Sequence, residues 1–142
     1  KLYKDVFDFI ENKIDDKFSS IYYRSSASPD EEKITKFINY LTNNLDKTKK
    51  YFFCSNNAKI KKQLCDTDLN IILFRDLNNH NLNHIPNGYY PSYDDAYFPV
   101  AEMLIMGESD EIFYAGEQSY VSLFNFYAMA VKNVKLKDIN NG

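Results

Sequence analysis

The sequence has no tryptophan and few glycines, prolines, cysteines and histidines: four, four, two and two among 142 residues. So few turn-forming residues argue against a fold of many short antiparallel strands. No apolar run approaches the roughly 20 residues that a membrane span needs. The formal net charge is −3, so the chain lacks the basic excess of nucleic-acid-binding domains. We therefore expect neither a membrane span nor a nucleic-acid partner.

The two cysteines, Cys54 and Cys65, match no metal or redox spacing. They are interpreted as buried thiols of a reducing compartment, which favours a cytoplasmic location, and a disulfide is the alternative. The chain begins at Lys1 and shows no signal-peptide pattern. From this start we expect a single domain over residues 1–142, cut from a longer protein.

Hydrophobic residues make up 44% of the chain and aromatic residues 16%, enough for a substantial core. Apolar runs of strand length alternate with helical patterns, which is typical of a parallel sheet. The sequence therefore predicts an α/β fold, a Rossmann-like doubly wound sheet of four or five parallel strands in three layers. The strands are expected at residues 20–23, 51–54, 70–74, 112–115 and 134–138, with 112–115 central and the last at an edge.

Two helix patterns carry specific expectations. Residues 2–16 place Tyr3, Phe7, Ile10 and Ile14 on one stripe, which predicts their burial. Further on, Ser-Pro-Asp-Glu at residues 28–31 reads as a capping box with serine at the N-cap.

A doubly wound sheet binds its ligand outside the carboxyl ends of the strands, where the strand order reverses. With the order 3-2-1-4-5, the reversal lies between the first and fourth strands. Arg24 follows the first strand and Gly116–Ser119 follow the fourth. A guanidinium beside backbone N–H groups is what a diphosphate requires. The alternative for Arg24 is a surface ion pair.

Three stretches together resemble a known family. They are Ile21-Tyr22-Tyr23-Arg24, the Tyr51–Asn57 strand and loop, and residues 94–131, in which an acidic residue in an apolar helix precedes a Ser-Asp turn, a strand and a Ser-x-Val helix. Over residues 19–131 the chain resembles the C-terminal half of fucosyltransferases of the α1,6 and nodulation type. The resemblance implies one half of a GT-B glycosyltransferase, with inverting transfer from GDP-fucose and no metal. It also implies a glycan acceptor and an N-terminal partner domain that this sequence lacks.

The resemblance also assigns roles to single residues. Arg24 would bind the donor phosphate and Glu102 the guanine edge, with glutamate in place of the more usual aspartate. Glu102 as a solvated helix-face residue is the alternative. Ser119 and Ser122 would contact phosphate or ribose, with an N-cap role as the alternative for Ser119. Ser55 and Asn56 would line the base or ribose side, unless they simply cap the following helix.

The chain departs from the family in its first strand. The usual His-x-Arg-x-x-Asp reads here Tyr22-Tyr23-Arg24-Ser25-Ser26-Ala27, without the histidine and the aspartate. No catalytic residue is assigned, and we expect the isolated domain to bind a nucleotide weakly and to transfer nothing. A non-catalytic binding or interaction module of the same fold remains the alternative, and a flavodoxin-like domain for another phosphate ligand is a further one.

An asparagine-rich stretch over residues 76–93 is expected to be a long loop. His80 and His84 have a spacing that could hold a metal on a helix, but the surroundings favour a solvated loop. Four tyrosines and two aspartates near its end could stack on a sugar acceptor or could only pack the loop: Tyr89, Tyr90, Tyr93, Tyr97, Asp94 and Asp95.

Overall fold

The chain folds around one five-stranded parallel sheet with the order β3-β2-β1-β4-β5. The computed structural model describes residues 1–14, 17–26, 28–75, 97–117, 125 and 127–139. The strands are β1 (Ser19–Arg24), β2 (Lys50–Ser55), β3 (Asn70–Ile72), β4 (Glu111–Gly116) and β5 (Lys135–Asp138). The helices are α1 (Leu2–Phe9), α2 (Glu31–Asn44), α3 (Ala58–Cys65) and α4 (Tyr97–Gly107), with π-helical turns η1 (Ile10–Ile14) and η5 (Tyr127–Val131).

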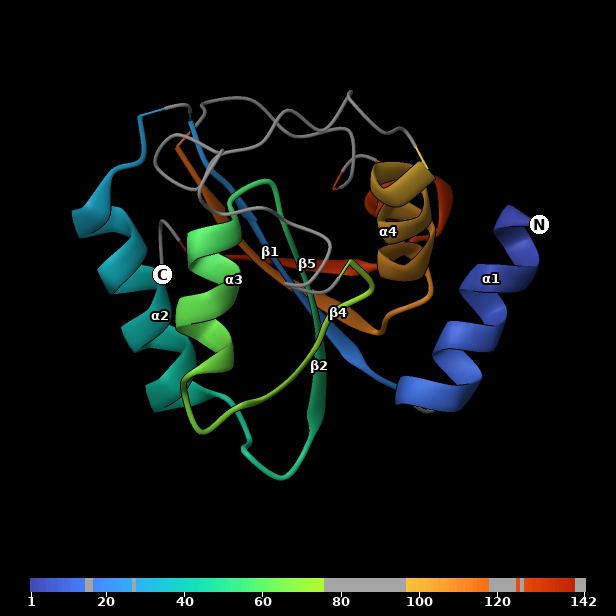
Figure 1. The fold of residues 1–142 in the computed structure, drawn as a ribbon, viewed down its shortest axis with the longest axis horizontal. Helices are drawn as coiled ribbons and strands as arrows, with labels where there is room; N and C mark the ends of the chain where they lie inside the picture. The colour runs from blue at the N-terminus through green and yellow to red at the C-terminus, as the bar shows by residue number, and fades with distance from the viewer. Residues whose placement is uncertain (15–16, 27, 76–96, 118–124, 126, 140–142) are drawn as a thin grey trace.

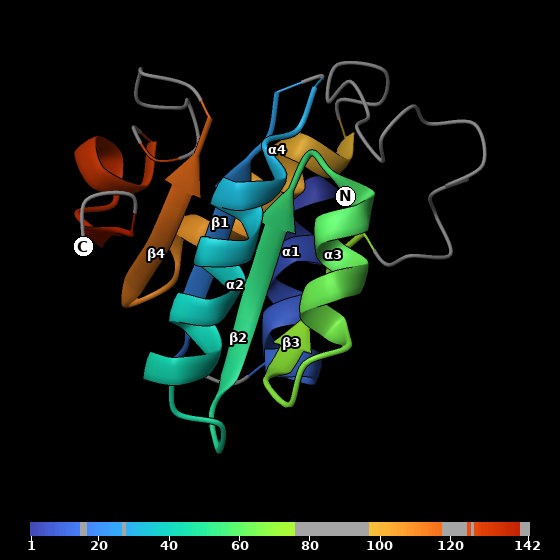
Figure 2. The ribbon, with the colours of Figure 1, turned by 90° about the vertical axis from the view of Figure 1, so that its left-hand side faces the viewer.

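The helices cover both faces of the sheet. Helices α2 and α3 lie on one side, and α1 and α4 lie on the other (Figure 1). The strands run in one direction between these layers (Figure 2). The predicted three-layer, doubly wound α/β fold is therefore confirmed, and the strand order is the one assumed in placing the switch point.

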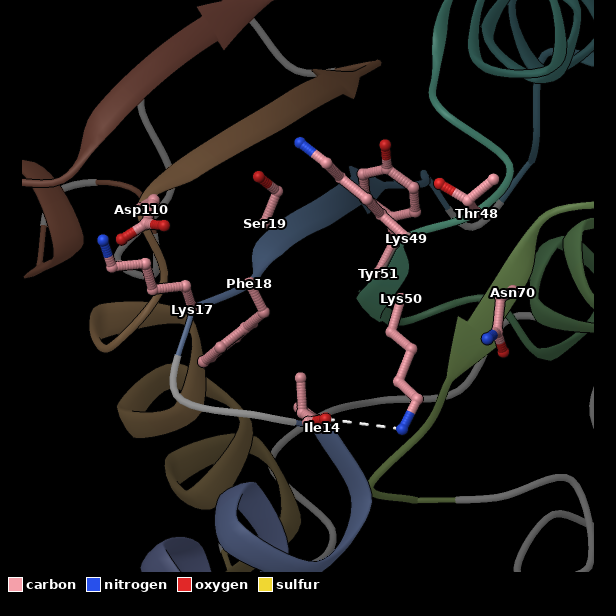
Figure 3. A pocket seen from close by; sticks show the side chains of 10 residues that line it. All are labelled: Ile14, Lys17, Phe18, Ser19, Thr48, Lys49, Lys50, Tyr51, Asn70 and Asp110. Carbon is pink, nitrogen blue, oxygen red and sulfur yellow. Dashed lines mark hydrogen bonds between the residues drawn. The ribbon is translucent and has the colours of Figure 1, made fainter.

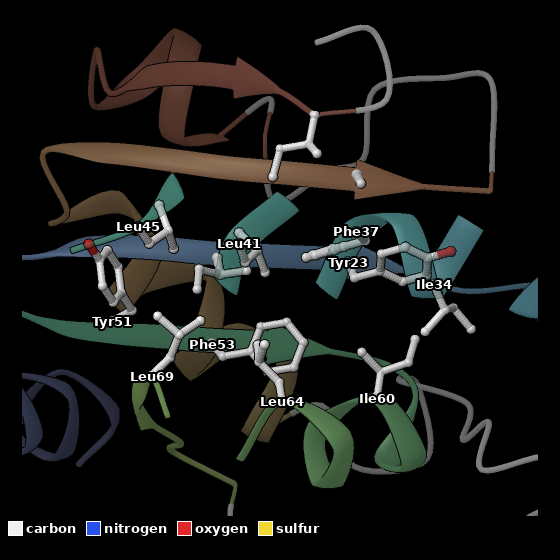
Figure 4. Packing of buried hydrophobic residues seen from close by; sticks show 13 residues of the cluster. Tyr23, Ile34, Phe37, Leu41, Leu45, Tyr51, Phe53, Ile60, Leu64 and Leu69 are labelled. Atoms are coloured by element: carbon white, nitrogen blue, oxygen red, sulfur yellow. The ribbon is translucent and has the colours of Figure 1, made fainter. Parts of the chain in front are cut away.

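Alternation along each strand divides the core into two clusters. In β1, Ile21 and Tyr23 face α2 and α3, whereas Tyr22 belongs to the cluster under α1 and α4. Figure 4 shows the first cluster, in which Tyr23 packs edge-on against Phe37 of α2 at 4.9 Å between ring centroids. Both faces of β1 are thus buried, as expected of the middle strand of such a sheet.

The fourth predicted strand lies in the sheet interior, between β1 and β5, although β1 is the middle strand. The last register pair between β1 and β4 is Arg24 with Gly116. The predicted reversal of strand order therefore falls between these two residues.

Two expectations about helix patterns are wrong. Helix α2 begins at Glu31, and its N-cap is Asp30, whose side chain accepts hydrogen bonds from the backbone N–H groups of Glu32 and Lys33. The cap thus lies two residues after Ser28, because the aspartate carboxylate meets the first unpaired N–H groups of the helix.

The second expectation, the stripe in the first helix, is wrong for Tyr3 and Phe7 and holds for Ile10 and Ile14, which pack into the core. Tyr3 and Phe7 are exposed, whereas Val6 and Ile14 are buried. Leu2, Val6 and Phe9 form a competing stripe at helical spacing, and it is this stripe that packs inward. The wider π-helical turn η1 then brings Ile14 into the same core.

Among the described residues, no helix has the length and apolar character needed to cross a membrane.

Two phenylalanines test this packing. Phe52→Ala should lower the free energy of unfolding by about 3–5 kcal/mol, because Phe52 is fully buried in β2. Phe7→Ala should change it by no more than about 0.5 kcal/mol, because Phe7 is 55% exposed. Urea denaturation of both variants measures the difference. Equal losses would contradict the placement of α1.

Candidate functional site

The carboxyl ends of β1 and β4 form the switch point of the sheet. The two strands approach closely there, because a β-carbon on Gly116 would lie 3.1 Å from the Arg24 carbonyl oxygen and 3.3 Å from Arg24 Cβ. The backbone N–H of Glu117 continues the ladder by donating to the Arg24 carbonyl oxygen over 3.0 Å. The structure thus brings Arg24 and Gly116 together, as the sequence predicted.

The Arg24 side chain belongs to the α1 and α4 side of the sheet. It lies two residues beyond Tyr22, which faces that layer. Burial raises the pKa of Cys54, which lies in the same cluster, and the Arg24 charge is close enough to oppose that rise weakly. The side chain is partly buried, yet its guanidinium makes no hydrogen bond or ion pair with any described residue.

A buried polar cluster adjoins this edge on the α4 side. Lys61 of α3 is fully buried, and its Nζ lies 3.8 Å from Glu102 Oε2 and 3.1 Å from the Arg75 carbonyl oxygen. Glu102 of α4 is 3% exposed, and its Oε2 has no hydrogen-bond partner among the described residues. The Cys54 thiol hydrogen-bonds to the same carboxyl group. The pair connects the two helical layers around the end of β2.

Burial is the main cause of the pKa shifts of Glu102 and Cys54. It raises the pKa of Glu102, while the charge of Lys61 and the Cys54 hydrogen bond oppose that rise. Burial, and then the Glu102 charge, raise the pKa of the Cys54 thiol well above its usual range. Cys54 is therefore a protonated donor to Glu102, and not a reactive thiolate.

The residues expected on the base or ribose side have structural partners. Asn56 Oδ1 accepts from the Ser25 N–H over 2.8 Å, and Asn56 Nδ2 donates to the Ser25 carbonyl oxygen over 2.9 Å. The Ser55 hydroxyl accepts from the Asn57 N–H, and the Asn57 side chain caps α3. A ligand role for Ser55 and Asn56 stays a prediction, but both side chains are buried.

A hollow of about 410 Å³ lies at the opposite, amino-terminal edge of the sheet. Three lysines line it, and Figure 3 shows that Lys17, Lys49 and Lys50 extend in different directions. Lys50 Nζ donates to the Ile14 carbonyl oxygen over 3.4 Å. Because these ammonium groups do not converge, we place the candidate site at the carboxyl edge, where parallel sheets bind ligands.

Several predicted residues fall outside the described part of the chain, so their roles stay predictions. These are Ser119, Ser122, His80, His84, Tyr89, Tyr90, Tyr93, Asp94 and Asp95. Conversely, sequence reasoning missed Lys61 and Glu117. Lys61 belongs to a Lys-rich helix that reads as solvated, and the partners of the Glu117 side chain are 87 to 94 residues away in sequence.

The sequence matches no known protein-family model, and neither curated proteins nor solved structures give a significant match.

A double-mutant cycle tests the Lys61–Glu102 pair. Lys61→Met should lower the free energy of unfolding by about 3–5 kcal/mol at pH 7, because it leaves a buried carboxylate without its cation. Lys61→Met/Glu102→Met should recover most of that loss, because it removes both charges. Urea denaturation of wild type, Lys61→Met, Glu102→Met and the double variant measures the coupling.

The same cycle should depend on pH. Without Lys61, the folded-state pKa of Glu102 rises further above its unfolded value, so the stability of Lys61→Met falls more steeply than wild type as pH rises above 4.5. The cost of Lys61→Met should therefore shrink toward pH 4. A cost that does not vary with pH would show that the two groups are not coupled.

Proposed function

We propose that this domain binds the diphosphate of a nucleotide-sugar donor in the crevice between the ends of β1 and β4. Arg24 carries the proposal. It stands at the switch point, partly buried, with a guanidinium that no described residue engages. A guanidinium in such a place gains most from a phosphate, which can accept two parallel hydrogen bonds from it.

The charge around Arg24 supports an anionic ligand on the α4 side. On that side, the charges of Lys61 and Arg75 act on Glu102, and the charge of Arg24 acts on the neighbouring Cys54. Glu117 is directed to the other side, toward Tyr23 and Asp30. A diphosphate beside Arg24 would therefore meet a positive field.

The choice of GDP rests on Glu102 and on the resemblance to fucosyltransferases. A carboxylate can accept hydrogen bonds from both N1–H and N2–H of guanine. Glu102 Oε2 accepts no hydrogen bond from any described residue. Because Glu102 is buried, the base would have to enter the cleft deeply to reach it. A comparison of GDP with ADP and UDP separates base recognition from phosphate binding.

The proposal assigns donor binding, and not catalysis, to this domain. Tyr22 occupies the position of the family histidine and is buried in the core under α1 and α4. Sugar transfer would need the glycan acceptor and a second wall of the cleft, which we assign to an N-terminal partner domain. A non-catalytic binding module is the second candidate, and the buried Tyr22 favours it because a core tyrosine cannot meet substrate.

Arg24→Ala should weaken GDP binding by about 1.5–3 kcal/mol, the scale of a charge-assisted hydrogen bond. Lys49→Ala is the matched control, because it removes one positive charge at the opposite edge of the sheet. Titration calorimetry measures both variants. Equal affinity of Arg24→Ala and wild type would overturn the diphosphate site, whereas an equal loss in both variants would indicate nonspecific charge attraction.

A further inference from the structure

Glu117 links the two strands that border the switch crevice. It follows β4, and its side chain reaches across to the chain that leaves β1. Its Oε1 accepts from the Asp30 N–H over 2.7 Å, and its Oε2 accepts from the Tyr23 hydroxyl over 3.0 Å. The Ser26 hydroxyl lies 3.1 Å from Oε1 and shares its proton with the Ser28 carbonyl oxygen at 2.7 Å. One carboxylate thus gathers donors from β1, from its exit loop and from the N-cap of α2.

The partners of the Glu117 carboxyl group are hydrogen-bond donors, so both of its oxygens act as acceptors. Burial and the Glu117 charge raise the pKa of Tyr23, so its hydroxyl remains a donor at physiological pH. Asp30 is the N-cap of the 14-residue helix α2, whose N-terminus attracts negative charge. Each oxygen of the Glu117 carboxyl group therefore has a donor next to the N-terminus of α2.

The exit of β1 is also held from the opposite neighbour. Asn56, after β2, hydrogen-bonds to both backbone groups of Ser25, while the Glu117 N–H bonds to the Arg24 carbonyl oxygen. Arg24 thus leaves the sheet between two fixed attachments, one from β2 and one from β4. The backbone that carries the guanidinium is set before any ligand arrives, which lowers the entropy cost of binding.

We propose that Glu117 is the positioning residue of this site, which fixes the loop between β1 and α2 and so holds Arg24 in place for an anionic ligand. The inference rests on the proposed function for its ligand. The attachment itself can be tested without any ligand.

The test compares Glu117→Ala, Glu117→Gln and the control Glu108→Ala in the 142-residue domain. Glu108 forms an ion pair with Lys132 at the molecular surface, so its removal changes the net charge equally without touching the loop. Glutamine can still accept from the Asp30 N–H, and its amide can donate to the Tyr23 oxygen. The first readout is NMR-detected exchange of the Asp30 amide, and the second is the affinity for GDP.

We expect Glu117→Ala to speed Asp30 exchange at least about tenfold and to weaken GDP binding about fivefold or more, because the loop loses its attachment. Glu117→Gln should restore most of both, and Glu108→Ala should match wild type. Unchanged Asp30 exchange in Glu117→Ala would overturn the positioning role. Faster exchange with unchanged GDP affinity would overturn its connection to Arg24. If wild type itself does not bind GDP, the proposed function fails, and the exchange readout still decides whether Glu117 fixes the loop.

Discussion

The parallel pairing of β1 with both β2 and β4 is the constraint on which the rest of the structure depends. The chain first builds outward from β1 to β2 and β3, and then returns to add β4 on the other side. Crossovers between parallel strands are right-handed, so this reversal places α2 and α3 on one face and α4 on the other. The strand order therefore reverses between β1 and β4, whose carboxyl ends carry the register pair Arg24 and Gly116.

Charged side chains flank the carboxyl edge of the sheet on both faces. On the α2 side, Glu117 uses its carboxylate to fix the exit of β1. On the α4 side, Lys61 and Glu102 form a buried pair whose desolvation cost offsets much of its attraction. Such a pair adds little to stability, although the loss of one partner alone is costly. Between the two groups, Arg24 is the cation that no described partner satisfies.

The sequence predicted the inner strands well because they are compact apolar runs bounded by polar residues, as in Tyr51–Cys54. It predicted the switch point because the βα alternation allows few topologies. It failed for the first helix because two apolar stripes compete there, and only packing against α4 selects Val6 over Tyr3. The burial of Lys61 and the role of Glu117 could not be read locally, since both depend on partners brought together by the sheet.

The most direct test of the account is an NMR titration of the isotope-labelled domain with GDP. The account predicts that chemical shifts change at the amides of Arg24, Gly116 and Glu117, at the carboxyl ends of β1 and β4. The amides of Lys49 and Lys50, which border the hollow at the amino-terminal edge, should stay unchanged. Shift changes confined to that hollow, or none at saturating GDP, would contradict a diphosphate site at the switch point.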